Sequence, residues 1–247
     1  MQDPSRSAPD PARTVARAPG ARFGAGFWAI RLLLVPVVED LALRVQAALP
    51  AGVWAPWLAA TCGLGLAAWL RRRPGPTAFW LTLALLALAA TLADLAALPA
   101  IRGAGAAAWL SFALIGSVLL IRQAGRTGGE ASGFNWLAAF WLLAVGGLVD
   151  PGLGRPEVFE PLHVLLLFAF ALAVLGFAHG ALQLEAAPIF WIAFGLASPA
   201  GAALGWVVAD AAEDGGLGLG PGATALLFGG LALLLVRAQA LRAGPRR

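Results

Sequence analysis

The chain has 247 residues, of which 60% are hydrophobic and 12% charged, and its formal net charge is +4. An average soluble domain carries about 25% charged residues, so a soluble globular protein is excluded and the bilayer must solvate most of the apolar surface. All 17 basic residues are arginines and Cys62 is the single cysteine, which excludes a retinal bound to lysine and an intrachain disulfide.

Eight apolar segments follow a polar N-terminal region. Residues 1–22, rich in Pro, Ala and Arg, are predicted to be a disordered tail, residues 23–240 a transmembrane helical domain, and residues 241–247 a short basic tail. The segments lie at 27–49, 51–70, 77–99, 103–121, 135–149, 161–183, 187–209 and 217–238. Because 135–149 is short for a bilayer, we expect either that its helix begins earlier, in the region 132–135, or that the bilayer thins around it.

The first segment is unusual because it carries four charged side chains around a central proline, Pro36. These side chains are Arg31, Glu39, Asp40 and Arg44. Charge at membrane depth is costly, so it marks a candidate functional site. Glu39 lies about twelve residues into the segment, roughly 18 Å deep and near the midplane of a ~30 Å hydrocarbon core.

Arginine counts predict eight crossings with both termini in the cytoplasm. With the N-terminal tail inside, only Arg102 and Arg155 fall on the outer side, and omitting the charged segment would destroy this bias. The composition is typical of a GC-rich genome, so we expect an all-α, multi-pass protein of a bacterial inner membrane. The thirteen cytoplasmic arginines are Arg6, Arg13, Arg17, Arg22, Arg71, Arg72, Arg73, Arg122, Arg126, Arg237, Arg242, Arg246 and Arg247.

The acids of the first segment permit a chemical and a structural interpretation. Asp40 and Arg44 are four residues apart on one helical face and are expected to pair, whereas Glu39 points about 100° away. Glu39 would then serve acid–base chemistry or proton carriage. The structural alternative is an interhelical pair between Arg44 and Asp94, which lie at similar distances from the outer ends of their segments.

The run PVVEDLALR, from Pro36 to Arg44, resembles the first motif of the CAAX-protease and bacteriocin-processing family of intramembrane proteases, P-x-x-E-E-x-x-x-R. The resemblance implies that Glu39 is the general base that activates water. It further implies that Asp40 stands in place of the second glutamate and that Arg44 is a structural or electrostatic partner.

Two later stretches are similar to the remaining motifs of that family. Phe159 to His163 has the form F-x-x-x-H, and His179 precedes Gln183 by four residues. The histidines are sixteen residues or roughly 24 Å apart on one predicted helix, so they cannot both reach Glu39 unless that helix breaks. His163 is the better catalytic candidate, and no cofactor or metal is expected.

The segment 187–209 carries a proline motif, Ser198-Pro199-Ala200-Gly201. A proline that only kinks a packed helix is one interpretation. The other is a broken helix whose freed backbone groups face a substrate cavity at the depth of Glu39, with Ser198 and Asp94 as substrate-binding candidates.

Small and aromatic residues predict how the helices pack and where they end. The pairs Gly176/Gly180 and Gly201/Gly205 are typical of close helix contacts, and the stretch GGLGLGPG at 215–222 is typical of a flexible connector. Tryptophans near the segment ends predict an interfacial belt. They are Trp28, Trp54, Trp57, Trp80, Trp109, Trp136 and Trp206.

Three functions remain open from the sequence. The first is a glutamate-dependent intramembrane protease that cleaves a membrane-protein or peptide substrate. The second is a proton- or cation-coupled small-molecule transporter that uses Glu39 and Asp40. The third is a non-catalytic membrane scaffold or assembly factor. The lipid bilayer is the expected partner in each case, and nucleic acid is not, because the arginines lie in short tails and loops.

Overall fold

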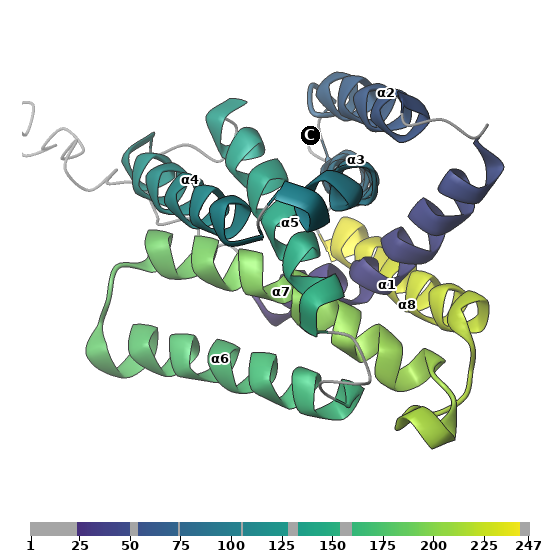
Figure 1. Cartoon of the computed structure of the whole chain (residues 1–247). Helices are drawn as coiled ribbons and strands as arrows, with labels where there is room; N and C mark the ends of the chain where they lie inside the picture. Colours follow the sequence, from purple (N-terminus) through teal and green to yellow (C-terminus); the bar gives the residue numbers. More distant parts are fainter. Residues whose placement is uncertain are drawn as a thin grey trace, which may run out of the picture.

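The computed structural model describes residues 24–49, 54–73, 75–104, 106–127, 133–153 and 160–242 (Figure 1). Across these ranges the chain is all-α and has no strand, as predicted. The predicted disordered tail and most of the basic C-terminal tail lie outside them. The helices are α1 Ala25–Ala48, α2 Trp54–Leu70, α3 Pro76–Ala104, α4 Ala106–Thr127, α5 Gly133–Leu153, α6 Pro161–Leu182, α7 Ala186–Ala209 and α8 Pro221–Arg242.

Each helix coincides with one predicted apolar segment. The short fifth segment is extended as expected, because α5 begins at Gly133. Four of the described helices are long and apolar enough to cross a membrane, namely α3, α6, α7 and α8. Helix α1 has 24 residues, which is sufficient length, but it carries four charged side chains.

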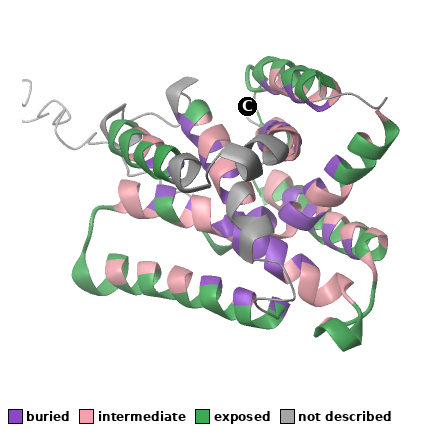
Figure 2. Ribbon diagram, viewed as in Figure 1, coloured by how far each residue is buried: buried purple, intermediate pink, exposed green. Residues whose placement is uncertain are grey.

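Helix α7 lies at the centre of the arrangement. It runs antiparallel to α6 and packs against α1 and α5, while α2 packs on α3 at the edge (Figure 1). The outward faces of α2, α4 and α6 are mostly exposed, as Figure 2 shows. These faces are rich in leucine and phenylalanine, which suits contact with lipid.

An aromatic cluster joins the N-terminal ends of α1, α3, α5 and α7. Phe27 contacts Trp80 and Phe190 at ring-centroid distances of 5.3 and 5.9 Å, and Phe79 contacts Trp136 at 5.6 Å. Trp80 is 5% exposed and donates a hydrogen bond to Gln239 of α8. The belt interpretation therefore suits Trp54, which is 77% exposed, but Trp80 belongs to the core.

The glycine-rich loop after α7 is held by backbone hydrogen bonds, unlike the flexible connector expected. The amides of Leu217, Leu219 and Gly220 donate to the carbonyls of Val207, Val208 and Ala209, respectively. The loop reaches these carbonyls through positive φ angles at three of its glycines, Gly215, Gly218 and Gly220. It therefore caps the C-terminal end of α7, whose last carbonyls lack helical partners.

Candidate functional site

Helices α1 and α7 each contain an interior proline, and both prolines are buried. Pro36 of α1 packs against Gly205 of α7, where an added Cβ would lie 2.9 Å from the Pro36 ring. One turn away, a Cβ at Gly201 would lie 2.7 Å from the Val35 Cβ. The predicted close packing at Gly201 and Gly205 is confirmed, and it brings the charged helix against α7.

Each proline also removes one helical hydrogen bond, which leaves the carbonyl four residues earlier without that partner. For Pro36, the carbonyl four residues earlier is that of Leu32. It faces Gly201, and a Cβ added at Gly201 would lie 2.8 Å from its oxygen. For Pro199, the carbonyl four residues earlier is that of Gly195. It faces Gly146 of α5, where an added Cβ would lie 3.0 Å from its oxygen. Glycine Cα–H groups can approach such carbonyls closely. Helix α7 is continuous through Pro199, so the broken-helix interpretation is wrong.

The guanidinium of Arg31 lies inside this contact. Its Nη2 donates a hydrogen bond of 2.5 Å to the Ser198 hydroxyl, and its Cζ lies 5.0 Å from the Phe194 ring centroid. The residue is only 2% exposed. Its Nε is buried without a hydrogen-bond acceptor in the part of the chain that the structure describes. A buried cation held by one neutral hydroxyl and one aromatic face is costly, so this position is a strong functional candidate.

The two acids further along α1, Glu39 and Asp40, have different surroundings. Asp40 accepts two hydrogen bonds from Arg44, of 2.7 Å from Nε and 3.2 Å from Nη2, which confirms the predicted local pair. The Arg44 side chain is 63% exposed. Glu39 is half-buried and interacts electrostatically with Arg31. Of the two basic residues of α1, Arg44 therefore pairs with Asp40, whereas Arg31 interacts with Glu39.

The structural alternative of an Arg44–Asp94 pair is not formed. The ion-pair partner of Arg44 is Asp40, and its Nη2 lies toward Gly222 at the N-terminal end of α8. Asp94 is buried in α3 against Gly147 of α5, where a Cβ would overlap its carboxylate. Asp94 thus lies at the α3–α5 contact, apart from the Asp40–Arg44 pair.

The structure places His163 on the exposed side of α6, and it does not bring this side chain to Glu39. The His163 side chain is 65% exposed, and its Nδ1 lies 3.4 Å from the Glu160 carboxylate. His179, at the other end of α6, has its Nδ1 3.1 Å from the Leu184 carbonyl oxygen. In that contact Nδ1 carries the proton and donates, which leaves Nε2 as an acceptor when the ring is neutral.

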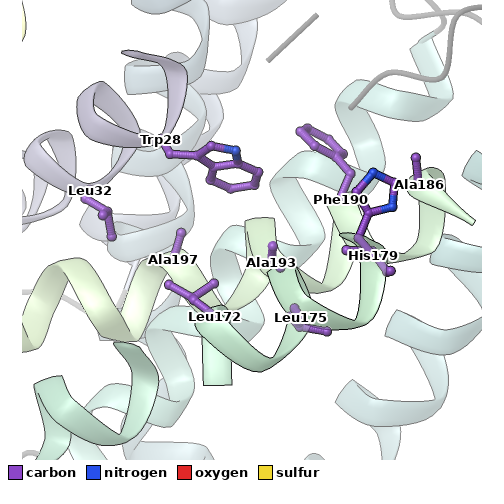
Figure 3. Close-up of a pocket in the computed structure, with 11 residues that line it drawn as sticks. Trp28, Leu32, Leu172, Leu175, His179, Ala186, Phe190, Ala193 and Ala197 are labelled. Atoms are coloured by element: carbon purple, nitrogen blue, oxygen red, sulfur yellow. The ribbon is translucent and has the colours of Figure 1, made fainter. Parts of the chain in front are cut away.

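A cavity of about 310 Å³ lies between α1, α6 and α7. Figure 3 shows Trp28 and Leu32 of α1 on one side, with His179 of α6 across from them. Leu172 of α6 and Ala197 of α7 also line the cavity. The volume is at the lower end of the range for small-molecule sites, and the lining is almost wholly apolar.

On both α1 and α7, a residue that lines the cavity is next in sequence to a residue of the buried hydrogen bond. Leu32 lines the cavity and directly follows Arg31, while Ala197 lines it and directly precedes Ser198. A shift of α1 on α7 would therefore alter the cavity and the hydrogen bond together. Across the described ranges, no group of three or more His, Cys, Asp or Glu side chains is arranged to hold a metal ion.

Comparison with known proteins adds no relative: no family model, no curated protein and no solved structure matches the chain. Sequence reasoning identified Ser198, Glu39 and the Asp40–Arg44 pair. It did not single out Arg31 or Phe194 as members of one site.

Proposed function

We propose that the protein is a proton- or cation-coupled transporter of small, largely apolar molecules in a bacterial inner membrane. One observation carries this proposal. The cavity between α1, α6 and α7 is walled in part by α1 and α7, the helices that the buried Arg31–Ser198 hydrogen bond joins. A transporter needs a binding space coupled to a charged element, and here a buried charge lies beside such a space.

The proposed membrane arrangement has eight crossings with both termini in the cytoplasm. It counts α1, α2, α4 and α5 as crossings beside α3, α6, α7 and α8. The arginine distribution supports it, and so does the aromatic cluster that gathers the N-terminal ends of α1, α3, α5 and α7. In an alternating arrangement these four ends lie on the same side of the membrane.

In this proposal Glu39 is the coupling acid. It interacts electrostatically with Arg31, whose guanidinium holds α1 against Ser198 of α7. Protonation of Glu39 would remove the negative charge that Arg31 experiences, which changes the balance between the two helix arrangements. The apolar substrate would occupy the cavity, with the His179 imidazole as its polar contact.

The geometry favours this function over the intramembrane protease that the resemblance implies. A glutamate-dependent protease needs a polar partner within reach of the water that Glu39 activates. His163, the expected partner, lies on the exposed side of α6 beside Glu160. Asp40, the counterpart of the second glutamate, is bound by Arg44.

The experiment is discharge of an imposed pH gradient by proteoliposomes that contain the purified protein and an internal pH dye. We expect members of a panel of small apolar amines and carboxylic acids to discharge the gradient faster than in empty vesicles. Glu39→Gln should slow this discharge about tenfold or more, because the coupling acid can no longer exchange a proton. Ala193→Trp, which fills the cavity, should abolish it as well.

Glu213→Gln is the matched control, because it makes the same change at an exposed acid of the short helix Ala212–Asp214. It should discharge the gradient at the wild-type rate. If no compound discharges the gradient faster than in empty vesicles, or if Glu39→Gln and Glu213→Gln are equally active, the transporter proposal is wrong. Peptide cleavage by the purified protein that Glu39→Gln abolishes would instead support the protease.

A further inference from the structure

A second groove of about 300 Å³ lies between α2, α3 and α5, apart from the cavity described above. Its walls are mainly apolar, with Leu64 of α2, Leu86 of α3 and Phe140 of α5 among them. Thr82 also lines the groove, and its hydroxyl donates to the Ala78 carbonyl of its own helix. The apolar part of the groove therefore suits a hydrocarbon chain.

One cationic side chain stands at the groove, that of Arg71. It is exposed and follows the last residue of α2. Within the described ranges its guanidinium has no carboxylate partner. The neighbouring Arg72 is also exposed but does not line the groove, and Arg73 lies over the Trp69 ring at 4.6 Å.

The groove is open on the side where lipid would lie. Ala68 and Leu137 line it and are exposed, so a molecule could enter from the bilayer without opening the core. Trp136 lines the groove near the N-terminal end of α5, and tryptophan side chains favour the boundary between hydrocarbon and headgroups. The groove thus combines a hydrocarbon-sized space with a cation at an interfacial depth.

We propose that this groove binds an anionic phospholipid, with one acyl chain between α2, α3 and α5 and the phosphate on the Arg71 guanidinium. Arginine binds phosphate oxygens in a bidentate, charge-assisted manner, and basic pockets between membrane helices select anionic headgroups. This inference goes beyond the proposed transport function and does not depend on it. It requires only that the helices lie in a membrane.

The test is a thermal-unfolding titration of the full chain in detergent with dioleoyl phosphatidylglycerol. Binding to the folded protein raises the unfolding temperature, and the titration gives an apparent affinity. Arg71→Gln should weaken this affinity about tenfold or more, since a charge-assisted phosphate contact is lost. Ala68→Phe should weaken it to a similar degree by filling the acyl site without changing any charge.

Arg72→Gln is the matched control, because it removes the same charge one residue away from the groove. It should keep the wild-type affinity. Dioleoyl phosphatidylcholine should bind more weakly than phosphatidylglycerol, and glycerol phosphate alone should give no shift. Equal effects of Arg71→Gln and Arg72→Gln, an unchanged affinity in Ala68→Phe, or a full shift with glycerol phosphate would each overturn the proposal.

Discussion

Replacing Gly201 with alanine is expected to destabilise the protein by about 1–3 kcal/mol, or more if the helices cannot separate. The added methyl group would lie 2.7 Å from the Val35 side chain and 2.8 Å from the Leu32 carbonyl oxygen. The carbonyl belongs to a backbone that cannot rotate away, so α1 and α7 must move apart. SDS-induced unfolding of the purified protein in detergent micelles would measure the loss.

Gly176→Ala is the matched control for this variant, because the sequence presents the same spacing of small residues there. No atom lies within 4 Å of an added Cβ at Gly176. Alanine is favoured over glycine in a helix by about 0.5–1 kcal/mol, so Gly176→Ala should be neutral or slightly stabilising. Similar losses in the two variants would contradict the close α1–α7 contact.

Ser198→Ala is expected to destabilise the protein by about 1–3 kcal/mol, since it leaves the buried Arg31 guanidinium without its side-chain hydrogen bond. Removing the charge as well should reverse this effect. The double variant Arg31→Met with Ser198→Ala should be more stable than Ser198→Ala alone, because a buried charge that loses its partner costs more than an apolar side chain of similar length. The same SDS titration would compare the variants.

Ser117→Ala is the control for a buried serine with neutral partners. Ser117 of α4 donates to the Ala113 carbonyl and accepts from Trp141, and no charged group depends on it. Its loss should cost about 0.5–1.5 kcal/mol, less than Ser198→Ala. If the double variant is less stable than Ser198→Ala alone, the hydrogen bond does not serve to compensate a buried charge.

The helices could be predicted closely because the bilayer dictates their length and regularity. A segment must satisfy its backbone inside hydrocarbon, so apolar runs of about 20 residues map onto helices. The start of α5 at Gly133 and the local pair of Asp40 with Arg44 followed from the same geometry. Helical spacing alone was therefore sufficient to predict the contacts between residues of the same helix.

Contacts between helices were harder to predict, because sequence does not say which faces meet. Gly201 lies in the α1–α7 contact, whereas Gly176 has open space, although the two share one motif. Arg31 lies about six residues into α1 and Ser198 about twelve into α7, a difference of roughly 9 Å in rise. Counting residues from the helix starts could not join them, because α1 and α7 begin at different depths, as the contact of Val35 with Gly201 shows.

Cysteine labelling in spheroplasts tests most directly whether the charged helix α1 crosses the membrane, as we propose. The exposed Cys62 is first replaced by alanine, and single cysteines are then placed at the exposed positions Gly24 and Ala48, at the two ends of α1. A membrane-impermeant maleimide should label Ala48→Cys in intact spheroplasts and label Gly24→Cys only after permeabilisation. Labelling of both cysteines from the same side would contradict the account.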